Sequence, residues 1–148
     1  MQRVLYFFLA VFVAYLFGTL TYSQLILANL AEMGVAIEMG TRFANAWHDF
    51  SHMYDLYLPL VSVALLLGFA VAGLVLRWVP QITTLGYVLG GFFAIYVMDY
   101  LLGAVLTGGT HPLVVTRTPM GLLSQCLAGA LGGWVFAFGM LRLKAKTS

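Results

Sequence analysis

Four long apolar stretches, separated by shorter polar segments, dominate the chain. They cover residues 4–22, 58–76, 85–106 and 120–141. Each is close to the roughly 20 residues that a helix needs to cross about 30 Å of hydrocarbon at about 1.5 Å per residue. The stretches are apolar all round, whereas membrane β-barrels show alternating segments of about 10 residues. The pattern predicts an all-α integral membrane protein: one domain with four transmembrane helices in an antiparallel bundle.

Composition strengthens this prediction. Of the 148 residues, 62% are hydrophobic and only 8% are charged, which leaves too little polar surface for a water-soluble globule. The first stretch follows Arg3, as in a secretory signal, but the next residues, Thr-Leu-Thr-Tyr-Ser-Gln, lack the small-x-small pattern of a cleavage site. We therefore expect an uncleaved first helix and a lipid bilayer as the main partner.

The distribution of Lys and Arg predicts the topology. One set of these residues lies at the two ends and in the second connection: Arg3, Arg77, Arg142, Lys144 and Lys146. Only Arg42 and Arg117 lie in the other two connections. Because cytoplasmic segments carry the excess of Lys and Arg, we expect a protein of the inner (cytoplasmic) membrane with both termini in the cytoplasm. Segments 23–57 and 107–118 are then expected outside. The net charge of +2 reflects this bias and indicates no nucleic-acid partner.

The loop over 23–57 is expected to contain an additional amphipathic helix, beginning after Thr41 and running over 42–57. At about 100° per residue, one side of this helix is polar and the opposite side is aromatic. The polar stripe contains Asn45, His48, His52 and Asp55, and the aromatic side contains Phe43, Trp47, Phe50, Tyr54 and Tyr57. The simplest interpretation is a helix at the membrane surface that binds no ligand.

Two histidines four residues apart also permit a metal site. His48 and His52 would chelate one ion such as zinc or copper, with Asp55 or Asp49 as an oxygen ligand. Zinc proteases with this spacing have Glu directly after the first His, where this chain has Asp49, so proteolysis is not inferred. Haem is a further alternative and would need His111 from the other outer loop. The last alternative is that these imidazoles transfer protons or sense pH.

A pocket near the outer side is predicted around Asp99, the one ionisable residue well inside a span. Gln125 and Ser124 lie at a comparable depth in the fourth span, and Tyr96 and Tyr100 are near Asp99 in sequence. The second outer loop adds His111 and Arg117, either of which can reach the same surface. Thr118 is expected to cap the fourth helix, with Pro119 in its first turn.

Glycine spacing predicts how the helices pack. Gly86 and Gly90 form a GxxxG pair in the third span, Gly129 and Gly133 form one in the fourth, and Gly68 with Ala72 repeats the spacing in the second. The third and fourth spans are therefore expected to form the tightest pair. A spare glycine face would equally join two copies of the chain. Cys126, the one cysteine, is interpreted as a buried packing residue.

No family resemblance emerges, and no catalytic residue is identified. The leading hypothesis is an inner-membrane protein, expected to be an oligomer, that binds or passes a small ion or solute through an outward-facing His/Asp/Arg pocket. One alternative is a non-catalytic accessory or assembly subunit of a larger membrane complex. The other is a metal- or haem-dependent membrane enzyme subunit that uses His48 and His52.

Overall fold

The computed structural model describes residues 2–32, 44, 47–48, 55, 57–106 and 118–147. Within these ranges the chain is helical, without a β-strand: α1 (Gln2–Glu32), α3 (Tyr57–Val75), the short 3-10 helix η2 (Pro80–Ile82), α4 (Thr83–Leu106) and α5 (Pro119–Thr147). Four segments of this described part are long and apolar enough to cross a membrane: Gln2–Leu25, Tyr57–Val75, Pro80–Val105 and Pro119–Ala145. The predicted all-helical fold with four such helices is confirmed.

Two helices extend beyond the apolar stretches that predict them. The sequence pattern ended the first span at residue 22, but α1 continues to Glu32, because Ser-Gln-Leu-Ile-Leu-Ala-Asn-Leu-Ala-Glu contains neither Gly nor Pro to stop it. At the other end of the chain, α5 continues through the basic tail to Thr147. Lys and Arg are good helix formers and, near a helix C-terminus, interact favourably with its dipole.

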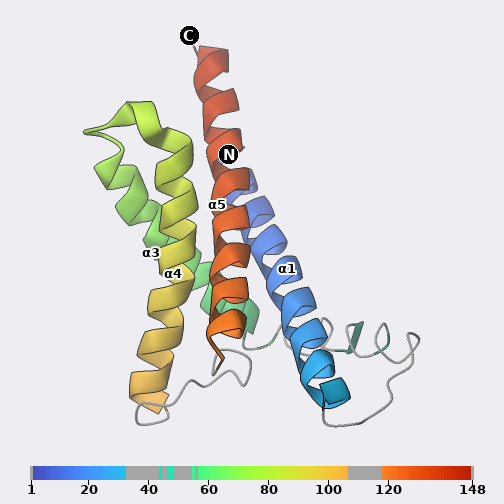
Figure 1. Ribbon diagram of the computed structural model, residues 1–148. Coiled ribbons are helices and arrows are strands. Elements are labelled where there is room, and N and C mark those ends of the chain that lie inside the picture. The colour runs from blue at the N-terminus through green and yellow to red at the C-terminus, as the bar shows by residue number, and fades with distance from the viewer. Residues whose placement is uncertain are drawn as a thin grey trace.

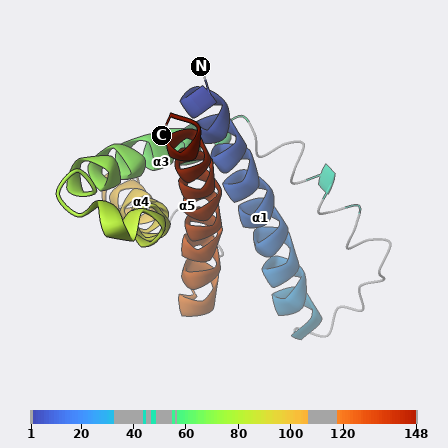
Figure 2. The same ribbon diagram turned by 90° about the horizontal axis from the view of Figure 1, so that it is seen from above.

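The bundle has two distinct ends (Figure 1). The terminal end holds the N-terminus, the C-terminus and the connection from α3 to α4, and the loop end is where α1 and α4 finish and α3 and α5 begin. Helix α5 runs between α1 and α4, while α3 packs on α4 and crosses behind it toward α1 (Figures 1 and 2). One helix therefore forms most of the internal surface of the bundle.

Glycines bring α4 and α5 into backbone contact. A Cβ atom on Gly91 would overlap the carbonyl oxygen of Gly129, and one on Gly133 would overlap the carbonyl oxygen of Tyr87. The expected close pairing of the third and fourth spans is confirmed, but through Gly91 instead of Gly90. A Cβ on Gly90 would lie 3.1 Å from the carbonyl oxygen of Gly68 in α3, so neighbouring glycines of α4 serve two different helices.

Four rings, one from each helix, form an aromatic cluster in the half of the bundle nearer the terminal end. Its members are Phe7 of α1, Phe69 of α3, Tyr87 of α4 and Phe136 of α5. The rings of Phe69 and Phe136 stack with centroids 4.7 Å apart. Tyr87 meets both edge-on, at 5.9 Å from Phe69 and 5.0 Å from Phe136. Such ring pairs stabilise by their geometry as well as by their contact area.

Candidate functional site

Buried polar side chains gather in the half of the bundle nearer the loop end. Thr19, Ser23, Asp99 and Gln125 are each no more than 2% exposed. They come from α1, α4 and α5, and Tyr57 at the start of α3 joins them. We call these five residues the polar cluster. In a membrane segment such residues have no water to bind, so each needs a partner within the protein or a ligand.

Gln125 makes hydrogen bonds that join three helices within the polar cluster. The hydroxyl of Tyr57 donates to Gln125 Oε1, and Gln125 Nε2 donates to the carbonyl oxygen of Gly18 at 3.0 Å. A Cβ atom on Gly18 would overlap the Tyr57 hydroxyl. Glycine is thus required where Tyr57 and Gln125 approach α1, and one amide side chain connects α1, α3 and α5.

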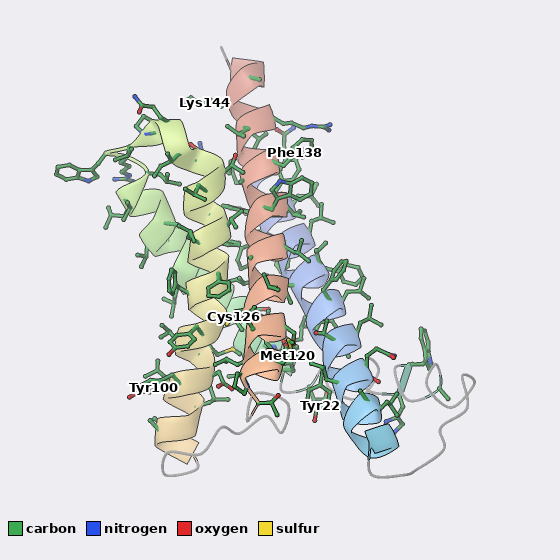
Figure 3. All side chains as sticks on the ribbon, viewed as in Figure 1. Tyr22, Tyr100, Met120, Cys126, Phe138 and Lys144 are labelled. Atoms are coloured by element: carbon green, nitrogen blue, oxygen red, sulfur yellow. The ribbon has the colours of Figure 1, made fainter. Side chains whose placement is uncertain are left out.

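Asp99 brings α4 into the same region. Its carboxyl group is 2% exposed and lies within electrostatic range of Tyr57 and of the Cys126 thiol. Cys126 is buried, as expected, in the part of α5 that passes through the polar cluster (Figure 3). A carboxyl group among a phenol, an amide and a thiol can exchange a proton or accept hydrogen bonds from a bound group.

The tyrosine near Asp99 is not one of those suggested by sequence proximity. Tyr96 is 45% exposed and Tyr100 64% exposed, and Tyr100 lies on the outer side of α4, away from α5 (Figure 3). Tyr57 takes this place instead, although the sequence pattern assigned it to the aromatic side of a surface helix. Its buried position follows from the fold, because α3 begins at Tyr57 in contact with the ring of Tyr15.

Helix α1 contributes a polar stripe that the sequence reasoning missed. Thr19 and Ser23 are four residues apart and therefore lie one above the other on the same side of the helix. Both hydroxyl groups are buried; Ser23 Oγ has no hydrogen-bond partner within the part of the chain that the structure describes, and the Thr19 hydroxyl interacts with the side chain of Tyr15. The detectable signal was the spacing itself: two small hydroxyl residues separated by one turn, across the end of the first apolar stretch.

Other predicted residues have mixed outcomes. The Ser124 hydroxyl donates to the carbonyl oxygen of Gly121 in its own helix at 2.7 Å. Thr118 caps α5 as predicted, because its Oγ1 accepts the Gly121 N–H at 3.1 Å and Pro119 is the first helical residue.

The structure describes only part of the expected metal site. His48 and Asp55 have exposed side chains, and the structure does not describe the other members of the hypothesis: His52, Asp49, His111 and Arg117. Most of the expected amphipathic helix over 42–57 also lies outside the described residues. Among those that are described, no group of three or more His, Cys, Asp or Glu side chains is placed to hold a metal ion.

Comparison with known proteins gives no relative: no protein-family model, no curated protein and no solved structure matches the chain.

Proposed function

We propose that this chain is a small polytopic protein of the cytoplasmic membrane that binds a small cation, the proton included, at Asp99, and takes it up from the loop end of the bundle. A single observation carries the proposal: Asp99 is a carboxyl group buried inside a membrane-spanning helix. Such a group is costly in hydrocarbon unless it is protonated, paired or bound to a cation, and ionisable residues in this position commonly mark ion or proton sites.

The neighbours of Asp99 favour a cation over an anion. The polar cluster supplies oxygen atoms from a carboxyl, two hydroxyls, a phenol and an amide, and oxygen atoms are the ligands of hard cations. Ser23 has a buried oxygen atom without a hydrogen-bond partner among the described residues, and Thr19 has a buried hydroxyl beside the Tyr15 side chain. Neither Lys nor Arg is among the buried residues of the described part. The negative charge of the Asp99 carboxylate, among side chains that also offer oxygen ligands, therefore favours a cation over an anion.

The proposed topology is an antiparallel bundle with both termini in the cytoplasm. Paired contacts support the antiparallel arrangement, since Gly91 is opposite Gly129 and Tyr87 is opposite Gly133. Arg3, Arg77 and Lys144 line one pocket at the terminal end, which is the side that the excess of Lys and Arg places in the cytoplasm. The loop end, which is nearer Asp99, would then face the outside.

We also propose that the chain assembles into an oligomer or a larger complex. The small-residue faces of the helices do not supply the interface, because they are used for packing within the chain. Most of their glycines face another helix of the same chain, and Gly86 faces Leu76 in the connection from α3 to α4; those that face a helix are Gly68, Gly90, Gly91, Gly129, Gly132 and Gly133. A second copy or a partner protein would have to bind elsewhere on the bundle.

The test compares Asp99→Asn with Asp55→Asn, which removes an acidic group from an exposed position. Purified protein in liposomes is titrated with protons and with sodium or potassium ions while infrared difference spectra record the carboxyl C=O band. We expect a band that responds to the cation in the wild type and in Asp55→Asn, and that Asp99→Asn lacks. Apparent cation affinity, measured for all three proteins by equilibrium dialysis because Asp99→Asn lacks the reporting band, should fall about tenfold or more in that variant, since interactions with a charged group contribute about 1.5–3 kcal/mol.

Flux across the same liposomes, followed with a pH-sensitive dye, separates binding from passage. Cation binding and flux that are unchanged in Asp99→Asn would contradict the proposal. Stable copurification with larger proteins, together with an Asp99→Asn variant that binds cations like the wild type, would favour the accessory-subunit alternative.

A further inference from the structure

The terminal end of the bundle contains a basic pocket that is separate from the polar cluster. Its volume is ≈ 920 Å³, and three cationic side chains line it from different segments: Arg3 in α1, Arg77 in the connection from α3 to α4, and Lys144 in α5. All three are exposed, so a ligand can reach them. Lys144 lies near the end of α5 (Figure 3).

Among the side chains that line this pocket, the charged ones are positive. Its lining contains no Asp or Glu, and the first turns of α1, η2 and α4, which begin at the same end, also contain none. The chain has five acidic residues. Four fall within residues 32–55 and the fifth lies in the half of α4 nearer the loop end: Glu32, Glu38, Asp49, Asp55 and Asp99. Several positive charges therefore converge here with helix N-termini, whose N–H groups also favour anions.

The other half of the lining is apolar. Val4, Leu76, Met140, Leu141 and Leu143 share the pocket with the cations. The buried Tyr87 also lines it and lies within electrostatic range of Arg3. The volume is within the roughly 300–1,000 Å³ typical of pockets for small organic ligands. An inorganic anion would use the cations and leave the apolar lining unfilled.

We propose that this basic pocket binds the phosphate of an anionic phospholipid. Arg3, Arg77 and Lys144 hold the phosphate, and the start of an acyl chain covers the apolar lining. One guanidinium group can donate two parallel hydrogen bonds to the oxygens of one phosphate. Basic pockets between membrane helices on the cytoplasmic side bind anionic headgroups. The inference does not depend on the proposed function, because the pocket is at the opposite end of the bundle from Asp99.

The chain offers a matched control in Arg142. This residue is also exposed and lies in the same helix as Lys144, but its guanidinium is 4.4 Å from the ring centroid of Phe138 and it does not line the pocket. At about 100° per residue, Arg142 and Lys144 lie on opposite sides of α5. Arg142→Gln and Lys144→Gln therefore each remove one positive charge from the terminal end of the bundle, but from different faces of α5.

The experiment measures lipid binding to the purified full-length protein in a nonionic detergent by native mass spectrometry. Phosphatidylglycerol is compared with phosphatidylcholine for the wild type, Arg77→Gln, Lys144→Gln, the triple Arg3→Gln/Arg77→Gln/Lys144→Gln, and Arg142→Gln. We expect one tightly held phosphatidylglycerol in the wild type and in Arg142→Gln. Affinity should fall about tenfold in Arg77→Gln and further in the triple variant, since each change removes charge-assisted hydrogen bonds.

Circular dichroism should give the same helix content for every variant, because only exposed side chains change; if the triple variant does not fold, the single variants decide. An equal loss of phosphatidylglycerol affinity in Arg142→Gln and Arg77→Gln would show that the lipid is attracted by surface charge in general, and would overturn the proposal. A second arm titrates inorganic phosphate and glycerol phosphate. Either of them binding as tightly as phosphatidylglycerol would overturn the assignment to a lipid.

Discussion

The aromatic cluster and the polar cluster draw on the same four helices but hold them together in different ways. In lipid, apolar side chains gain nothing from leaving water, so the rings of the aromatic cluster stabilise the bundle by contact and ring geometry alone. The polar cluster connects helices through hydrogen bonds for which no water competes. The first cluster therefore has a structural role, whereas the second contains groups with chemistry beyond what packing requires, above all Asp99.

The largest effect on stability is expected from Phe69→Ala in the aromatic cluster. Phe69 is 5% exposed and contacts the rings of Phe7, Tyr87 and Phe136. Removing a buried Phe costs about 3–5 kcal/mol in soluble proteins. We expect about 2–3 kcal/mol here, because the part due to transfer from water is absent in lipid. The measurement is the free energy of unfolding in mixed micelles titrated with a denaturing detergent.

Phe93→Ala is the control for this prediction. Phe93 also lies in a membrane helix but is 57% exposed on the outside of α4, and its removal should change the unfolding free energy by no more than about 0.5 kcal/mol. Equal losses in the two variants would mean that ring contact with lipid stabilises as much as the aromatic cluster does, and the comparison between the clusters would fail.

A smaller effect is expected from the hydrogen bond between Tyr57 and Gln125. Tyr57→Phe removes the donor and leaves Gln125 Oε1 without it, whereas Gln125→Met also removes the bond to Gly18. Hydrogen bonds between membrane helices contribute about 0.6 kcal/mol on average and at most about 1.7. A double-mutant cycle on these two residues should give a coupling energy in that range.

Tyr100→Phe is the matched control, since Tyr100 is 64% exposed and should lose little stability. A coupling energy indistinguishable from zero would mean that the polar cluster does not fix the relative positions of α3 and α5.

Hydropathy predicted most of the fold because a membrane helix must be long and apolar, and both properties are visible in sequence. The identities of Thr118 and Pro119 predicted the cap of α5, because capping depends only on local chemistry. Hydropathy did not predict which face of each helix is turned inward. These helices are apolar almost all round, so position on the helix gives no preference, and close approach decides instead: Gly91 contacts α5 and Gly90 contacts α3.

The candidate site was predicted in part for the same reason. Asp99 and Gln125 are conspicuous because a charged or amide side chain is rare in an apolar span, and both are buried. Tyr57, Thr19 and Ser23 are ordinary residues in such spans. Their membership of the polar cluster depends on contacts between helices, as when Gly18 allows Tyr57 and Gln125 to approach.

The smallest stability effect, and the sharpest test of how the clusters differ, is expected from Thr19→Val and Ser23→Ala. Ser23→Ala removes a hydroxyl that has no hydrogen-bond partner within the described residues, and Thr19→Val removes one that interacts with the Tyr15 side chain in its own helix. Replacing such a buried hydroxyl by an apolar group should change stability little. Unfolding free energy should therefore stay within about 0.5 kcal/mol of the wild type. If both hydroxyls serve the cation proposed at Asp99, affinity in the infrared titration should nevertheless fall. The opposite result would be a loss of stability like that of Tyr57→Phe, with cation affinity unchanged. The hydroxyls of α1 would then have a structural role only. In that case the polar cluster would differ from the aromatic cluster only in the kind of contact that joins the helices.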